Sequence, residues 1–160
     1  MPRVAGPRRG RSSSSASILA DLDGHRRYLD QAWHAAQAAP LSARKAMLVA
    51  ALIDAFVDHQ FAADAAWDDI LEYRAARAAR SQALGWIMDL CSQRRVQLVT
   101  EAVPVPISQY ERLSVEDFMV SLYNDHSVQR LRLVLPGGER VDMQQALAAA
   151  IEDLDEPLRD

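Results

Sequence analysis

The stretch VQRLRLVLPGGERVDMQQALAAAIEDL, residues 128–154, decides the fold class. In its first eight residues leucine alternates with arginine or valine, which is the two-residue period of a strand with one buried face. The PGGE that follows is a turn signal leading into a second short strand, so the segment predicts a β-hairpin. Asp142 with Gln145 resembles a capping box and predicts a helix over the remainder. A strand, a turn, a strand and a helix in this order exclude an all-helical protein.

Two elements are expected immediately before the hairpin. Residues 94–106, RRVQLVTEAVPVP, are rich in β-branched side chains and predict a strand, with Pro104 and Pro106 at its end or on a sheet edge. Residues 113–124 predict an amphipathic helix that Ser114 caps. Its expected apolar face consists of Val115, Phe118, Met119 and Leu122.

The first half of the chain predicts four helices. The first covers residues 18–40 and ends at Pro40, and Ser42 caps a second whose wide apolar stripe is typical of a central helix. We expect Asp64 to cap a third helix and Ser81 to begin a fourth. The third should bury Trp67, Ile70, Leu71 and Ala78, and the fourth should bury Leu84, Ile87, Met88 and Cys91.

The predicted fold is therefore α+β. A mainly helical N-terminal half is followed by strand, helix, β-hairpin and helix, with a small antiparallel sheet. We expect one globular domain over residues 18–156, with a sub-boundary near residue 92 that would separate a helical part (18–92) from an α+β part (93–156). Residues 157–160 are expected to form a C-terminal tail.

Composition favours a soluble protein of a reducing compartment. The chain has 160 residues, 49 % hydrophobic and 25 % charged, and Cys91 is its only cysteine, so it forms no internal disulfide. No apolar run reaches the roughly 18–20 residues that span a bilayer, and no signal peptide is apparent. Arginine and alanine are abundant and Lys45 is the only lysine, as in proteins of GC-rich bacteria. These features predict a cytoplasmic bacterial protein.

Residues 1–17, MPRVAGPRRGRSSSSAS, carry four arginines and no acid. A segment of this composition, without apolar periodicity, predicts a disordered basic tail. Such a tail has the charge to contact nucleic acid or acidic lipid.

Residues 123–131, YNDHSVQRL, place acid, imidazole and hydroxyl side by side. Asp125, His126 and Ser127 are consecutive, whereas the members of a catalytic triad usually converge from separate elements. The favoured interpretation is a helix-to-strand turn, in which Asn124 adopts a left-handed backbone. His126 stays a weak candidate for a functional site.

Other chemistry-bearing groups match no motif. Asp54 and Asp58 share a helix face near His59 and Asp64, but the spacing fits neither zinc nor di-iron helix motifs. Cys91 lies on an apolar stripe, where a buried thiol is the common case. The PGGE turn lacks the lysine step of a phosphate-binding loop. No cofactor, metal or catalytic residue is therefore predicted.

Nucleic-acid binding is the alternative function. A helix followed by a hairpin with Arg130, Arg132 and Arg140 resembles a winged helix, and the basic tail would add phosphate contacts. Against it, the helix that would enter the groove carries Glu116 and Asp117 and no basic residue.

The leading functional prediction is a non-enzymatic protein-interaction, adaptor or regulatory module. Its expected contact surface is the free hairpin edge with Arg130, Arg132 and Arg140, together with the proline-bounded strand around Val103 and Val105. A homodimer follows if that edge pairs with itself, and the partner is otherwise another protein. No membrane contact is predicted.

Overall fold

The computed structural model describes residues 20–92 and 95–158, so the predicted basic tail lies outside the described residues. The fold is α+β with the helices first, as predicted. Helices and strands follow in the order α1 (Leu22–Gln37), α2 (Ala43–Ala63), α3 (Ile70–Arg80), α4 (Gln82–Cys91), β1 (Gln97–Pro104), η1 (Ile107–Arg112), α5 (Val115–Tyr123), β2 (Ser127–Val134), β3 (Arg140–Asp142) and α6 (Met143–Asp153).

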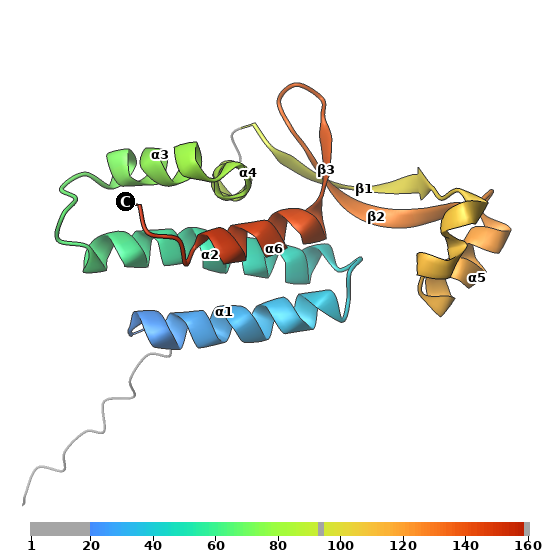
Figure 1. Cartoon of the computed structure of the whole chain (residues 1–160), viewed down its shortest axis with the longest axis horizontal. Coiled ribbons are helices and arrows are strands. Elements are labelled where there is room, and N and C mark those ends of the chain that lie inside the picture. Colours follow the sequence, from blue (N-terminus) through green and yellow to red (C-terminus); the bar gives the residue numbers. More distant parts are fainter. Residues whose placement is uncertain (1–19, 93–94, 159–160) are drawn as a thin grey trace, which may run out of the picture.

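Helix α2 is the centre of a helical body made of α1–α4 and α6. Its residues Val49, Ile53 and Val57 are fully buried, and it packs against α1, α3, α4 and α6. In Figure 1, α1 lies along one side of α2, and α3 with α4 lies along the other. Among the described helices, α2 alone has the length and apolarity to cross a bilayer. Its contacts with four helices of the same chain are those of a core helix.

Side-chain caps begin most of the helices. Ser42, Ser114 and Asp142 each accept a hydrogen bond from the backbone N–H three residues later, as the sequence predicts. Ser81, where the sequence predicts a helix start, caps α4 in the same way. The predicted cap of the third helix is wrong. Asp64 lies at the end of α2, and Asp69 caps α3 by accepting from the N–H of Leu71.

The buried side of α3 also differs from the prediction. Leu71 is 72 % exposed, whereas Tyr73 and Arg77 are buried, with only 2 % and 6 % exposed. The stripe of α3 that faces α2 and α4 therefore contains Tyr73 and Arg77, four residues apart, and not Leu71. The aromatic rings of Phe61 and Trp67 pack against Tyr73 at centroid distances of 5.7 and 5.5 Å.

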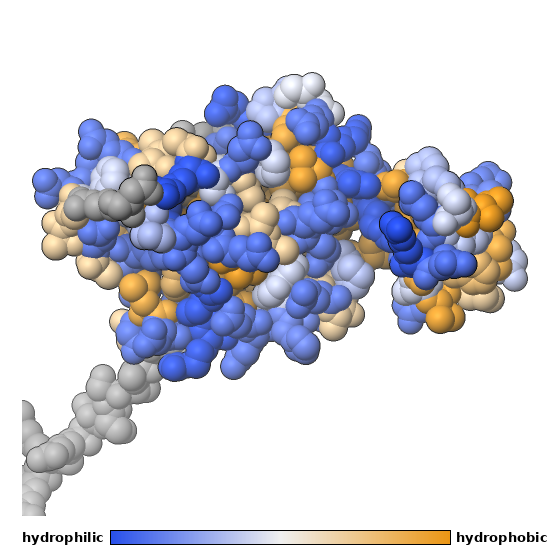
Figure 2. All heavy atoms as spheres, in the orientation of Figure 1, coloured by the Kyte–Doolittle hydropathy of each residue, from blue (hydrophilic) through white to orange (hydrophobic). Residues whose placement is uncertain are grey.

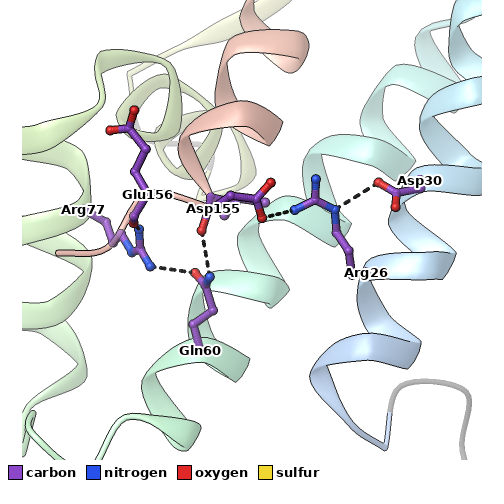
Figure 3. Close-up of polar contacts among 7 residues, drawn as sticks. Arg26, Asp30, Gln60, Arg77, Asp155 and Glu156 are labelled. Atoms are coloured by element: carbon purple, nitrogen blue, oxygen red, sulfur yellow. Dashed lines mark hydrogen bonds and ion pairs between the residues drawn. The ribbon is translucent and has the colours of Figure 1, made fainter.

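Buried Arg77 joins the C-terminal turn to the body (Figure 3). Its Nη1 donates to the carbonyl of Glu156 at 2.7 Å, and its Nη2 donates to Oε1 of Gln60 at 3.1 Å. The Tyr73 hydroxyl accepts from the same guanidinium, at 3.2 Å from Nη2. Gln60 in turn donates to the carbonyl of Leu154 at 2.9 Å. One arginine thereby satisfies polar groups from α2, α3 and the turn after α6.

The C-terminal segment predicted as a tail is partly packed. Leu158 is half-buried against the core, and its carbonyl accepts from Nη1 of Arg80 at 3.1 Å. Arg26 of α1 holds the preceding turn through Asp155 at 2.5 Å and bonds Asp30 at 3.0 Å (Figure 3). Residues 159 and 160 lie outside the described residues.

The sheet has the strand order β1-β2-β3 and is antiparallel throughout. β1 pairs with β2 along all eight of its residues, whereas β3 pairs only with residues 132–134. β1 with β2 therefore forms a two-stranded ribbon for most of its length. In the predicted PGGE turn between β2 and β3, Gly138 has φ +85°, a conformation that favours glycine.

Different helices cover opposite faces of the ribbon at its two ends. Leu131, Leu133 and Leu135 are buried on one face, in the main core with α6, as their alternation predicts. Val128 is also buried, at 2 %, but it lies on the opposite face and outside that core. On this second face the guanidinium of Arg130 reaches α5.

Residues 105–126, which we call the lobe, lie at the end of the ribbon away from the helical body (Figure 1). The lobe contains η1, α5 and the turn into β2. Among the described elements, α5 packs chiefly against β2. Figure 2 shows the lobe standing off from the body, joined to it by the ribbon.

Candidate functional site

The lobe is built by local signals that end β1 and begin α5. Pro104 is the last residue of β1, and Pro106 precedes the 3-10 helix η1, which the sequence did not predict. The Ser114 hydroxyl then accepts from the N–H of Asp117 at 3.1 Å and starts α5. These signals return the chain to the ribbon as β2.

Helix α5 turns most of its apolar side chains outward. Ser121 is fully buried, and Asp117 and Phe118 are half-buried beside it, so the polar residues share the inward side. The predicted apolar face is therefore wrong as a core face, since only Phe118 of its four residues turns inward. The exposed set is Val115 (79 %), Met119 (47 %), Val120 (44 %), Leu122 (50 %) and Tyr123 (83 %).

This exposure is concentrated in one place. Nine large hydrophobic side chains are exposed in the part of the chain that the structure describes, and six of them lie in the lobe, with Ile107 of η1 the sixth. Figure 2 shows hydrophobic atoms at several points on the surface of the lobe. A small helical lobe whose outer surface is richer in large apolar side chains than its inner surface has the composition of an interface.

A small interior holds the lobe together. The rings of Tyr110 and Phe118 meet edge to face at a centroid distance of 5.4 Å. The Ser121 hydroxyl donates to the carbonyl of Phe118 at 2.7 Å, and the Ser121 carbonyl accepts from the N–H of His126 at 3.0 Å. With Val128 buried beneath α5, these contacts fix how the outer face is presented.

His126 is exposed on the lobe and forms no triad with its neighbours. Its Nδ1 hydrogen-bonds the Tyr110 hydroxyl, and its carbonyl accepts from the N–H of Val105 at 2.7 Å. No side-chain hydrogen bond joins it to Asp125 or Ser127 among the described residues. The prediction of a turn is confirmed, but the left-handed residues are Asp125 (φ 49°) and His126 (φ 57°), not Asn124.

The three predicted surface arginines all have acidic partners. Nη2 of Arg130 lies 2.9 Å from Asp117 of α5. Arg140 pairs with Glu101 of β1, and Nε of Arg132 lies 3.7 Å from the same carboxylate group. A phosphate group binding to this face would have to compete with carboxylates already in place.

The backbone N–H and carbonyl groups of Val103 and Val105 do not point toward the free edge of β1. The N–H of Val105 donates to the carbonyl of His126, the residue before β2, and alternation then directs the backbone groups of Val103 to β2. The outward backbone groups are those of Thr100, Ala102 and Leu98. Pro104 shares this outward register, so its missing N–H removes no bond between the strands.

The acidic residues near His59 bind an arginine. Nη1 of Arg74 donates to Asp58 at 2.6 Å, and Nη2 bonds Asp54. Within residues 20–92 and 95–158, no group of three or more histidine, cysteine or acidic side chains is placed to hold a metal ion.

His59 instead faces a second, buried histidine. His25 is 2 % exposed, its Nε2 lies 3.0 Å from the carbonyl of Leu52, and its Nδ1 lies 3.3 Å from Nδ1 of His59. To donate to Leu52, a neutral His25 carries its proton on Nε2, so Nδ1 accepts from His59. Burial lowers the pKa of His25, the Leu52 carbonyl opposes this, and His59 lowers the pKa further.

Stability is therefore expected to fall as the pH drops below about 6.5. The unfolded chain, with an ordinary histidine pKa near 6.5, binds a proton that folded His25 resists. The contribution of neutral His25 to the free energy of unfolding is fully present above that pH. It is lost progressively as the pH falls from the unfolded pKa to the lower pKa of the folded state. Urea unfolding midpoints measured between neutral and mildly acidic pH test this. His25→Gln, whose amide offers an N–H to Leu52 and an oxygen to His59, should flatten the slope, and an equal slope in both proteins would contradict it.

Cys91 is poorly suited to nucleophilic chemistry. Burial, followed by the charge of Asp54, raises the pKa of the thiol to about 11, although Arg74 opposes the shift. Little thiolate is present at neutral pH.

The cavity lined by Arg77, Ser81 and Asp153 has about 10 Å³, roughly the space for one water molecule.

The exposed residues of α5 were missed because periodicity reports only that a helix has an apolar stripe. Five of the nine residues of α5 are exposed and apolar, and at 3.6 residues per turn they fall within an arc of about 160°, slightly less than half of its circumference. The available signal was that Asp117 and Ser121, four residues apart, give so short a helix a polar side opposite its apolar residues.

Comparison with known proteins adds no assignment. The chain matches no protein-family model, no curated protein and no solved structure.

Proposed function

We propose that this protein is a non-enzymatic protein-interaction module whose contact surface is the outer face of the lobe. The observation that carries the proposal is the outward apolar face of α5, which with Ile107 holds six of the nine exposed large hydrophobic side chains. Exposed apolar patches on soluble proteins mark interaction sites. On this proposal the module acts in the bacterial cytoplasm.

The energetics favour a partner for this face. Burying a leucine, valine or methionine side chain contributes roughly 1.5–3 kcal/mol. Val115, Met119 and Leu122 lie at spacings of four and three residues, the stripe by which a helix packs against another element. The partner would therefore cover a continuous stripe rather than scattered side chains.

The surroundings of the face support binding rather than catalysis. The ring of His126 bonds the Tyr110 hydroxyl, Cys91 has a raised pKa, and Asp54 with Asp58 binds Arg74. The lobe itself offers apolar contact area at the end of a ribbon, a geometry suited to reaching another molecule.

Capture from a lysate of the native host tests the proposal. Met119→Gln combined with Leu122→Gln keeps the charge of the lobe but removes apolar contact, so recovery of the specific partner should fall by at least about tenfold. Leu71→Gln is the matched control, because Leu71 is 72 % exposed on α3, outside the lobe. The captured chain, including any untagged copy of this protein, is identified by its mass. Equal recovery of the partner with the wild-type chain, the double variant and Leu71→Gln would contradict the proposal.

A further inference from the structure

Two of the remaining exposed hydrophobic side chains form a second surface at the start of α2. Leu41 is 49 % exposed and Leu48 is 44 % exposed, and Arg44 and Lys45 lie exposed between them. Leu48 is three residues from Lys45 and four from Arg44, so the three share a helix face. We call Leu41, Arg44, Lys45 and Leu48 the basic patch.

The lobe has the opposite charge beside its apolar face. Residues 105–126 hold four carboxylates against a single arginine, and of the four only Asp117 is ion-paired, to Arg130. Glu111, Glu116 and Asp125 are exposed and form no ion pair within the described ranges 20–92 and 95–158. Over the same ranges, Arg44 and Lys45 form none either. Both surfaces are thus apolar, and their unpaired charges are complementary.

We propose that the lobe of one copy docks on the basic patch of a second copy, in a two-fold symmetric dimer with two such contacts. The inference rests on the proposed function and names its partner. Helix α5 would lay Val115, Met119 and Leu122 against Leu41 and Leu48. The exposed carboxylates of Glu111 and Glu116 would meet Arg44 and Lys45.

The fold favours a second copy over the chain's own patch. No glycine occurs between Gln97 and Val134, and β1 and β2 pair along eight residues, so the ribbon holds the lobe away from its own body. The start of α2 lies at the end of the body nearest the lobe along the long axis of the molecule (Figure 1). A second copy turned by a two-fold axis can present the same patch to each lobe.

Analytical ultracentrifugation of the full chain at micromolar concentrations tests the inference. Wild-type protein should sediment with twice its 17.8 kDa mass. A lobe variant, Glu111→Lys with Glu116→Lys, and a patch variant, Arg44→Glu with Lys45→Glu, should each dimerise at least about tenfold more weakly, because like charges would meet. Leu71→Gln should dimerise as the wild type does.

Mixing the two charge-reversed variants gives the decisive result. In a mixed dimer the reversed lobe meets the reversed patch, and the two native surfaces meet each other, so dimerisation should return. Closure of each lobe on its own body would not be restored by mixing. Recovery in the mixture supports the inference, and mixed variants that stay monomeric overturn it.

Other outcomes also decide. A wild-type monomer throughout the concentration range overturns the dimer, as does a dimer that both reversed variants still form, or a polymer in place of a dimer. If another protein is captured through Met119 and Leu122 while the chain stays monomeric, the proposed function stands and this inference fails. Circular dichroism of each variant confirms that the helices are retained.

Discussion

Replacing Arg77 with alanine is expected to lower the free energy of unfolding by about 3 kcal/mol. The side chain is 6 % exposed, and it satisfies the carbonyl of Glu156, the amide oxygen of Gln60 and the hydroxyl of Tyr73. Without it the hydroxyl of buried Tyr73 and the half-buried amide oxygen of Gln60 lose this donor, and the turn at Glu156 loses its bond to α3. Equilibrium unfolding in urea measures the loss.

Two variants show whether the effect comes from this network. Arg77→Lys keeps the charge but lacks the planar fork that reaches several acceptors, so its stability should lie between those of the wild type and the alanine variant. Arg27→Ala removes an exposed arginine from α1 and should change stability by less than about 0.5 kcal/mol. An Arg77→Ala protein as stable as Arg27→Ala would show that the network contributes nothing net.

Replacing Leu133 with alanine is expected to lower the free energy of unfolding by about 2–5 kcal/mol. Leu133 is fully buried on the face of β2 that packs into the main core with Met143 and Leu147 of α6. The cost combines lost transfer free energy with a cavity that the neighbouring helix and strands fill only in part. Thermal and urea unfolding should both show the change.

Val128→Ala is the matched comparison within the same strand. Val128 is buried at 2 %, but it lies outside the main core, beneath α5. Its loss should loosen the lobe and leave the body folded, so the amide protons of α5 should exchange faster while those of α2 change little. Equal protection losses in α2 and α5 would show that the lobe and the body unfold together.

The sequence predicted best those features that depend on neighbouring residues. Ser42, Ser114 and Asp142 were identified as caps because an N-cap satisfies a donor only three residues away. The alternating leucines of β2 were assigned to the core because a strand turns alternate side chains to one face. Neither inference requires knowledge of the rest of the fold.

The errors involve choices that only packing decides. Asp64 and Asp69 are equally good caps, and the chain uses Asp69 because α3 begins after a turn in which Asp64 bonds Ala66. Leu71 was expected in the core, yet the position of α3 buries Tyr73 and Arg77 instead. A hydrophobic stripe predicts amphipathicity without fixing its direction.

The location of the candidate site also depends on which side of a helix packs inward, and the sequence does not fix this for α5. The sequence predicted an interaction module and named Val103, Val105 and three arginines, but the structure pairs these residues internally and exposes α5. His126 was a candidate because Asp125 and Ser127 flank it in the sequence. Its hydrogen-bond partners are instead Tyr110, Ser121 and Val105, which lie elsewhere in the sequence. Sequence proximity is a poor guide where the contacts are made across a folded lobe.

The register of the ribbon limits how this chain can change length in evolution. Leu131 faces the body and Val128 faces α5, so inserting one residue pair between them, one residue in each strand, would carry α5 to the opposite side of the ribbon. Inserting two residues in each strand would return α5 to its present side of the ribbon and move the lobe outward by about 7 Å. Related chains that keep the lobe on the same side should therefore differ in ribbon length by even numbers of residues per strand, and their reach should change in steps of that size.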